Sequence, residues 1–148
     1  MRRVFVNGES RALDGPPGTM LDAALRRGLG LKSVLHGCES GGCGTCRVLV
    51  DGQLVASCTR PLEAIPNGVV IETAEGLQEV PRMRTVLRAF VAERDTRCSL
   101  CVGGLGVTAV HLERARCAHD ERAVDAALEG ASCACTGRGS LRRALLVP

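Results

Sequence analysis

The sequence predicts an α+β protein with two small domains, one over residues 1–75 and one over residues 76–148. In the first half, short apolar runs separated by turn residues are typical of β-strands. In the second half, apolar residues recur every three or four positions, which is the helical period. We therefore expect a small mixed sheet with one helix lying across it, followed by a compact bundle of four short helices.

Two hairpins and one further strand account for the expected sheet. The dipeptides Asn7-Gly8 and Asp51-Gly52 are strong hairpin-turn signals, and apolar residues flank each of them. The expected strands are residues 3–6, 9–13, 48–50, 54–56 and 69–71.

One short helix is expected between the two hairpins. Pro16-Pro17-Gly18 breaks the second strand, and Thr19-Met20-Leu21-Asp22 then has the spacing of a capping box. The helix should end at Gly28. Its apolar face would carry Leu21, Ala24 and Leu25.

The second half begins with a predicted linker over residues 74–78. The first helix after it has Pro81 in its first turn, and its apolar stripe is formed by Val80, Met83, Leu87, Phe90 and Val91. Further helices are expected over residues 102–114, from the N-cap Asp120 to just before Gly130, and over residues 141–146.

Nine cysteines stand out in a chain with two Phe, no Trp and no Tyr. Domains this small bury little apolar surface, so they usually need a disulfide or a metal for stability. No apolar run of signal-peptide length follows the first residues, which favours a cytoplasmic protein with reduced thiols. Metal sites are therefore expected rather than a disulfide scaffold.

Charge and hydropathy exclude two other classes of protein. The net charge is only +3, the arginines are scattered, and there are no aromatic platforms for bases, so a nucleic-acid role is not expected. No apolar stretch is long enough to predict a membrane span.

The first group of four cysteines is Cys38, Cys43, Cys46 and Cys58, with the spacing C-x4-C-x2-C-x11-C. This spacing is typical of plant-type 2Fe–2S clusters. Three thiolates must come from one tight loop, and Gly37, Gly41, Gly42 and Gly44 would give the loop the conformations and close approaches that it needs. The alternative is a structural zinc site, but zinc usually takes C-x2-C pairs.

The second group is Cys98, Cys101, Cys133 and Cys135, which form a C-x2-C pair and a C-x-C pair separated by a gap of 31 residues. The spacing alone fits zinc and iron–sulfur equally. Both pairs are expected at helix N-termini, which stabilise thiolates and an anionic cluster. Cys117 belongs to neither group and is expected to be a buried or half-buried thiol without a role.

Both motifs resemble those of one known family. The first runs from Gly37 to Cys46 and continues through residues 48–52 to Ser57-Cys58, and the second combines Cys98-Ser99-Leu100-Cys101 with residues 133–137. Together they are similar to the small iron–sulfur subunit of the molybdenum hydroxylases, the xanthine oxidase family that includes aerobic carbon monoxide dehydrogenase. The resemblance covers nearly the whole chain.

The resemblance implies a plant-type ferredoxin-like (β-grasp) domain, followed by a four-helix bundle domain with a second 2Fe–2S cluster. It implies a large molybdopterin subunit as catalytic partner and FAD on a further subunit. Electrons would pass from molybdopterin to the second cluster, then to the first, then to FAD. The chain would have no substrate site of its own, and Cys135 would lie near the pterin.

Departures from the family concentrate around the second motif. Arg97 replaces a usual Gln, Val102-Gly103-Gly104 replaces Thr-Pro-Gly, and Ala134 replaces a usual Arg. Our hypothesis is that Arg97 and Cys135 contact a differently built cofactor site on the partner, and the alternative is that Arg97 faces solvent.

Two other functions remain open at this point. The chain could be a two-cluster ferredoxin subunit of a non-molybdenum dehydrogenase, such as a flavin enzyme. It could also be a zinc-stabilised adaptor without a redox role.

Overall fold

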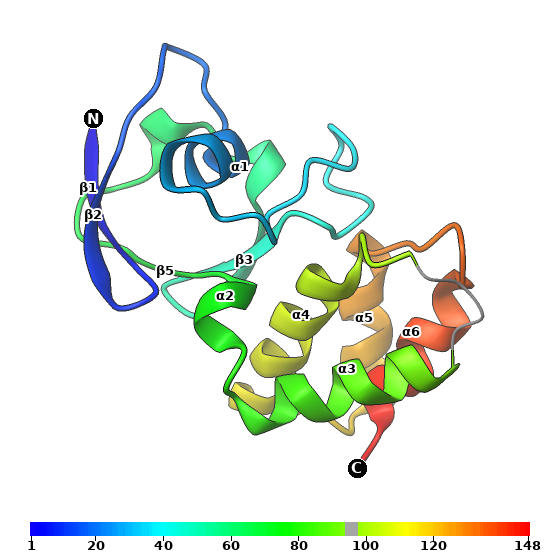
Figure 1. The fold of residues 1–148 in the computed structure, drawn as a ribbon. Helices are drawn as coiled ribbons and strands as arrows, with labels where there is room; N and C mark the ends of the chain where they lie inside the picture. The colour runs from blue at the N-terminus through cyan, green and yellow to red at the C-terminus, as the bar shows by residue number, and fades with distance from the viewer. Residues whose placement is uncertain (94–97) are drawn as a thin grey trace.

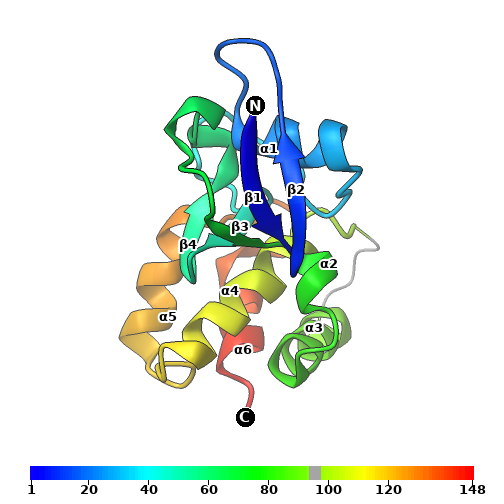
Figure 2. The ribbon, with the colours of Figure 1, turned by 90° about the vertical axis from the view of Figure 1, so that its left-hand side faces the viewer.

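The computed structural model describes residues 1–93 and 98–148. Its N-terminal half is a five-stranded mixed sheet with the strand order β2-β1-β5-β3-β4. The strands are β1 (Arg2–Val6), β2 (Glu9–Leu13), β3 (Arg47–Val50), β4 (Gln53–Ala56) and β5 (Val70–Glu72). Strands β1 and β5 pair in parallel, and the other neighbours are antiparallel. The predicted mixed sheet is confirmed (Figures 1 and 2).

Both predicted hairpin turns are present. Asn7 and Gly8 have φ of 51° and 85°, and Asp51 and Gly52 have φ of 48° and 78°. Two successive residues with positive φ are the requirement of a type I′ turn, whose twist matches that of the flanking strands.

The helix of this half differs from its prediction at its start. It consists of α1 (Leu21–Ala23) and a π-helical turn, η1 (Ala24–Gly28), and its predicted apolar face is buried. The predicted capping box is wrong, because Thr19 Oγ1 donates to the carbonyl of Pro16 at 2.7 Å and no side chain of the described residues caps the helix. The buried Asp22 carboxylate instead lies 2.5 Å from Nδ1 of His36.

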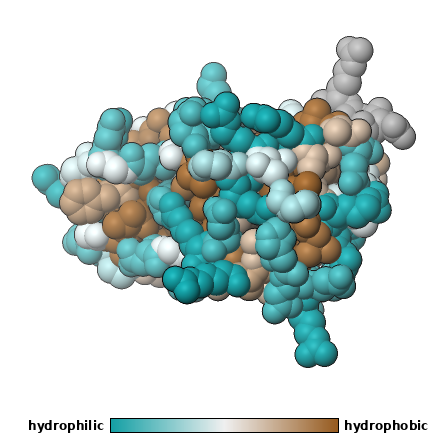
Figure 3. Space-filling model, turned by 90° about the horizontal axis from the view of Figure 1, so that it is seen from below, coloured by the Kyte–Doolittle hydropathy of each residue, from teal (hydrophilic) through white to brown (hydrophobic). Residues whose placement is uncertain are grey.

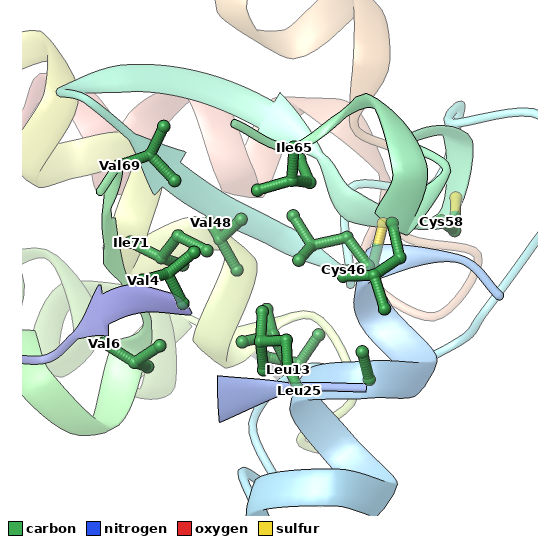
Figure 4. Packing of buried hydrophobic residues seen from close by; sticks show 14 residues of the cluster. Val4, Val6, Leu13, Leu25, Cys46, Val48, Cys58, Ile65, Val69 and Ile71 are labelled. Atoms are coloured by element: carbon green, nitrogen blue, oxygen red, sulfur yellow. The ribbon is translucent and has the colours of Figure 1, made fainter. Parts of the chain in front are cut away.

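The core of the first half lies between the sheet and this helix (Figure 4). Branched side chains such as Val4, Val48 and Ile71 are buried there together with Leu25. Cys46 and Cys58 belong to the same cluster, with 1% and 5% of their surface exposed. Two thiols of the first group are therefore part of the apolar core.

The second half is helical. Its helices are α2 (Ala74–Leu77), α3 (Pro81–Glu93), α4 (Val102–Arg114), α5 (Glu121–Ala127) and α6 (Gly137–Leu146). Short 3-10 turns are η2 (Ser57–Thr59) and η3 (Leu62–Ala64) in the first half and η4 (Leu128–Gly130) after α5. Helices α3 to α6 form the predicted four-helix bundle, and α4 lies next to the sheet (Figures 1 and 2).

Three details of the bundle can be compared with their predictions. The Asp120 carboxylate accepts hydrogen bonds from the backbone N–H groups of Arg122 and Ala123, which confirms the predicted N-cap. In α3 the predicted stripe is partly wrong, since Val86 is fully buried whereas Val91 is half exposed. Helix α6 begins at Gly137, one turn before the predicted start.

The predicted linker over residues 74–78 is wrong, because this segment contains α2. Ala74 and Leu77 are buried in a small core that contains Leu49 of the sheet and Val107 and Val110 of α4. Burial against elements far away in the sequence stabilises a helix that the local sequence did not indicate. This core spans the junction between the two halves, and the predicted domain boundary at residue 75 remains a prediction.

Polar contacts also join the two halves. The Arg114 guanidinium on α4 donates to both carboxylate oxygens of Glu72 at 2.6 and 3.1 Å. The Glu75 carboxylate accepts from the backbone N–H of Ser33 at 2.8 Å and from the Thr73 hydroxyl at 2.6 Å. The junction is therefore held at several separate points.

Hydrophobic and hydrophilic side chains alternate on the face of the molecule seen in Figure 3. No helix within the described residues has both the length and the apolar character needed to cross a bilayer.

Candidate metal centres

The first group of cysteines is positioned by a loop and a 3-10 turn. Cys38, Cys43 and Cys46 lie on the loop between η1 and β3, and Cys58 lies in η2 after β4. Gly41 and Gly44 both have φ of +77°, a conformation that favours glycine.

Glycine is also needed at position 37 of this loop, because there is no space for a side chain. A Cβ atom there would lie 2.9 Å from Cys43 Sγ and 2.6 Å from Thr45 Oγ1. The glycines therefore give the loop its conformation and leave room for the thiols.

The four thiols of this group form two pairs. Cys38 and Cys43 are joined by a side-chain hydrogen bond, as are Cys46 and Cys58. The hydrogen bond from Cys43 lowers the pKa of the Cys38 thiol to about 6. Burial, followed by the contact with Cys46, raises the pKa of the Cys58 thiol to about 12. One pair is thus close to solvent and the other lies in the core.

The second group is placed by the starts of two helices, as predicted. Cys98 and Cys101 precede α4, with Cys101 at its N-cap, and Cys133 and Cys135 precede α6. Side-chain hydrogen bonds link Cys101 with Cys133, and Cys135 with both Cys98 and Cys133. Two of these contacts combine one thiol from each helix start, so the packing of α4 against α6 determines the site.

Burial differs within the second group. Cys101 is buried and Cys135 is exposed. Burial raises the pKa of the Cys101 thiol to about 12. For Cys133, burial raises the pKa, but hydrogen bonds from the hydroxyl and backbone of Thr136 outweigh it, so the pKa falls to about 7. The Thr136 hydroxyl lies 3.0 Å from Cys133 Sγ.

The donor set can be tested against the two candidate groups. Within the described residues, no cysteine forms a disulfide bond. Within the described part of the chain, no three or more Cys, His, Asp or Glu side chains converge closely enough to hold one metal ion. A zinc ion needs four donors around a single centre, whereas the ligands of a 2Fe–2S cluster divide between two irons. Each set of four cysteines can supply the four thiolates that the two irons of one 2Fe–2S cluster need.

The remaining residues singled out in the sequence lie apart from these pairs. Cys117 is half buried against the helical core, as predicted, and its thiol donates to the carbonyl of Leu112 at 3.5 Å. The contact with Asp22 raises the pKa of His36. Arg97 lies outside the described residues.

One residue of the site region was missed in the sequence. Arg47 follows Cys46 directly and opens β3, yet its guanidinium is buried and donates to Thr108 Oγ1 at 2.9 Å and to the Ala127 carbonyl at 2.6 Å. Burial is the largest influence on its pKa and lowers it. A charged residue at the start of an otherwise apolar strand was the signal that could have indicated it.

Comparison with known proteins agrees with this geometry. Residues 4–69 match the family described as "2Fe-2S iron-sulfur cluster binding domain", and residues 73–146 match the family described as "2Fe-2S binding domain". The beta subunit of the 6-hydroxypseudooxynicotine dehydrogenase complex of Paenarthrobacter nicotinovorans is 37% identical over 135 residues, which cover 90% of this chain and 84% of the relative. The iron-sulfur-binding subunit of Escherichia coli O157:H7 xanthine dehydrogenase is 35% identical, covering 89% of this chain and 83% of the relative.

The chain belongs to the molybdenum hydroxylase family. Within this family it is a small iron–sulfur subunit that carries two 2Fe–2S-binding domains and transfers electrons.

Solved structures of the family confirm the predicted fold class, a ferredoxin-like domain followed by a helical domain. Quinoline 2-oxidoreductase from Pseudomonas putida 86 superimposes with a TM-score of 0.84 at 30% identity, over 99% of this chain and 90% of that chain. The aldehyde oxidoreductase from Desulfovibrio gigas gives a TM-score of 0.83 at 28% identity, over 98% of this chain. Our chain spans only 16% of that longer oxidoreductase chain.

Proposed function

We propose that this chain relays electrons from a molybdopterin-containing catalytic subunit, through its second and then its first cysteine site, to FAD on a further subunit or to another acceptor. We further propose that the complex works in the cytoplasm. One observation carries the proposal: thiols of both sites, Cys43 and Cys101, line the same small cavity of about 10 Å³ at the junction of the two halves. Two sites that share one buried cavity are close enough to exchange electrons.

We assign four ligands to each cluster. The first would be held by Cys38, Cys43, Cys46 and Cys58, and the second by Cys98, Cys101, Cys133 and Cys135. A bound 2Fe–2S cluster supplies a one-electron carrier. The protein supplies the thiolates, and the glycine-rich loop presents backbone N–H groups that favour an anionic cluster.

The chain's own backbone also fixes the distance between the two sites. The backbone N–H of Ser132, next to Cys133, donates to the carbonyl of Cys43 at 3.2 Å, and its hydroxyl donates to the carbonyl of Gly42 at 3.4 Å. A ligand loop of one site is thus bonded directly to a ligand loop of the other.

The two sites face different surroundings, which supports the proposed direction. Cys135 is exposed, so the second site is open towards a partner at this point. Several relatives are named as subunits of dehydrogenases, and one of them as a subunit of a dehydrogenase complex. These names support a catalytic partner for this chain as well. We propose that this partner approaches Cys135 and also contacts Arg97, which directly precedes Cys98 in the sequence.

Anaerobic purification of the chain with its partners tests the proposal. We expect about four irons and about four acid-labile sulfides per copy of this chain, and two distinct EPR signals on reduction. Molybdenum and flavin should copurify on the larger subunits. A colourless chain loaded with zinc, or a chain with a single EPR-active centre, would contradict the relay. A flavin partner without molybdenum would instead identify the non-molybdenum dehydrogenase subunit.

A further inference from the structure

Arg47 is a buried cation at the junction of the two cysteine sites. Only 8% of its surface is exposed, although it is one residue from Cys46 in the first site. Burying a guanidinium is costly unless hydrogen bonds or opposite charges compensate. The groups that offset the cost of burying Arg47 therefore indicate its role.

Neutral oxygen atoms from the second domain satisfy its hydrogen bonds. Nη1 donates to Thr108 Oγ1 on α4 at 2.9 Å, and Nη2 donates to the Ala127 carbonyl at the end of α5 at 2.6 Å. Both partners are more than 60 positions away in sequence, so Arg47 crosses the domain junction. Neither bond neutralises the positive charge.

Cysteines of both sites lie near this cation. Cys46 of the first site precedes Arg47 in the chain, and Arg47 lines the small cavity together with Cys43 and Cys101, one cysteine from each site. Arg47 is therefore adjacent to the first site on the side that faces the second.

The surrounding chain leaves space for the guanidinium. A Cβ atom on Gly130 would lie 2.9 Å from Arg47 Nη2. The hydroxyl of Thr108 is held in turn, because it donates to the carbonyl of Gly104 at 2.7 Å while it accepts from Arg47. The position of the charge is thus fixed on several sides.

We propose that Arg47 is a positioning residue whose unneutralised charge raises the reduction potential of the first site and so favours the transfer of electrons into it. This inference rests on the proposed function. One-electron reduction adds a negative charge to the site, and a fixed cation in a medium of low dielectric constant stabilises that charge. The same cation, held by α4 and α5, keeps the two domains in register.

The test is a redox titration of both EPR signals in the full chain with its clusters. In Arg47→Gln we expect the ratio of reduced to oxidised first centre, at a given ambient potential, to fall about tenfold, which is about 59 mV for a one-electron couple. Arg47→Lys retains the charge and should stay within about twofold of the wild type. The control Arg114→Gln removes another arginine of the domain junction, one that pairs with Glu72 at 2.6 Å, and should shift neither centre.

The outcomes separate the inference from the function on which it rests. Unchanged potentials in Arg47→Gln, with both signals present, would overturn the inference and leave the relay intact. A shift in Arg47→Lys as large as that in Arg47→Gln would show that geometry rather than charge matters, and would also overturn it. A wild-type chain without two centres would overturn the relay itself.

A second measurement covers the case in which Arg47→Gln does not retain its clusters. Chain labelled with 15N in the arginine guanidinium groups should show a 15N hyperfine coupling to the reduced first centre in pulsed EPR. The coupling should disappear in labelled Arg47→Lys. Its absence from the wild type would overturn the inference without any need for the Gln variant.

Discussion

The two cysteine sites of this chain are built in different ways. Three of the four thiols of the first site come from one loop of nine residues, Cys38 to Cys46, and the fourth comes from η2. The second site takes two thiols from each of two helix starts, and 31 residues separate the two pairs of cysteines. The first site therefore depends mainly on local conformation, and the second depends on how two helices pack.

The two sites also differ in how deeply their thiols are buried. The first site has two thiols in the apolar core of the sheet domain, Cys46 and Cys58. In the second site only Cys101 is buried, and Cys135 is exposed. The comparison indicates that the first site is protected on its inner side, whereas the second is open to a partner.

The strongest test of this comparison is Cys58→Ser. Removing one of the two buried thiols should abolish the first cluster and leave the second, because the second site shares no ligand with it. We expect about two irons per chain instead of about four, and one EPR signal instead of two.

Cys117→Ser is the matched control, since Cys117 is the thiol outside both groups, and it should leave iron and signals unchanged. Loss of both signals in Cys58→Ser would show that the sites are not independent.

The next largest effect is expected from Gly104→Ala, which acts on the junction between the sites. A Cβ atom at this position would lie 1.8 Å from the carbonyl oxygen of Gly44, which is backbone in the first ligand loop. We expect the free energy of unfolding of the cluster-loaded chain to fall by about 3 kcal/mol, because neither backbone can move away cheaply. Denaturant unfolding measures it.

Gly139→Ala is the control for Gly104→Ala. Its added Cβ would meet only the end of the flexible Arg143 side chain, at 3.3 Å, and alanine favours a helix, so stability should be unchanged or slightly higher. Equal losses in the two variants would refute the close contact as the cause.

Iron removal tests the difference in exposure between the sites. In the isolated chain, a hydrophilic chelator should extract iron from the second site severalfold faster than from the first, because Cys135 is exposed whereas Cys46 and Cys58 are buried. Both EPR signals can be followed in one sample, so each serves as the reference for the other. Equal rates, or faster loss from the first site, would contradict the comparison.

The smallest expected effect is a pH dependence at the junction. Hydrogen bonds from Ser33 and Thr73 lower the pKa of Glu75 below its ordinary value of 4.5, although burial, the largest single influence, acts to raise it. A carboxyl whose pKa is lowered in the folded state contributes stability above its unfolded pKa, and this contribution is lost as the pH falls through the folded value.

We therefore expect Glu75→Gln to lose roughly 0.5 kcal/mol at pH 7, a small value because the side chain is partly screened by water, and to lose little below pH 4. Glu79→Gln is the control, because Glu79 is 82% exposed beside Arg84 and should change little at either pH. A loss in Glu75→Gln that is the same at both pH values would argue against the carboxylate charge.

Elements defined by neighbouring residues were predictable from the sequence. Asn7-Gly8 and Asp51-Gly52 fix their turns through their own backbone preferences, and Asp120 caps its helix through residues two and three positions later. The bounds of the helix over residues 102–114 were also predicted, in spite of its glycines.

Elements defined by distant contacts were not predictable. Residues 74–78 contain no clear helix signal, and α2 forms because Ala74 and Leu77 bury against the other half. Val86 rather than Val91 faces the core of the bundle for the same kind of reason.

In the candidate sites, too, the features set by local sequence were predictable and those set by distant contacts were not. Spacing was enough to group the cysteines, and the ligand assignment itself remains a prediction. The pairing of Cys98 with Cys135 depends on how α4 and α6 pack, which spacing does not specify. Arg47 was missed because its partners, Thr108 and Ala127, lie 61 and 80 positions away.

The contact between Gly104 and the Gly44 carbonyl has a consequence for protein engineering. Helix α4 packs directly against a ligand loop of the other domain, so neither half can be paired with an unrelated domain without a steric clash. A chimera that joins this ferredoxin-like half to a foreign helical module would need to transplant the glycine at position 104 together with the partners of Arg47.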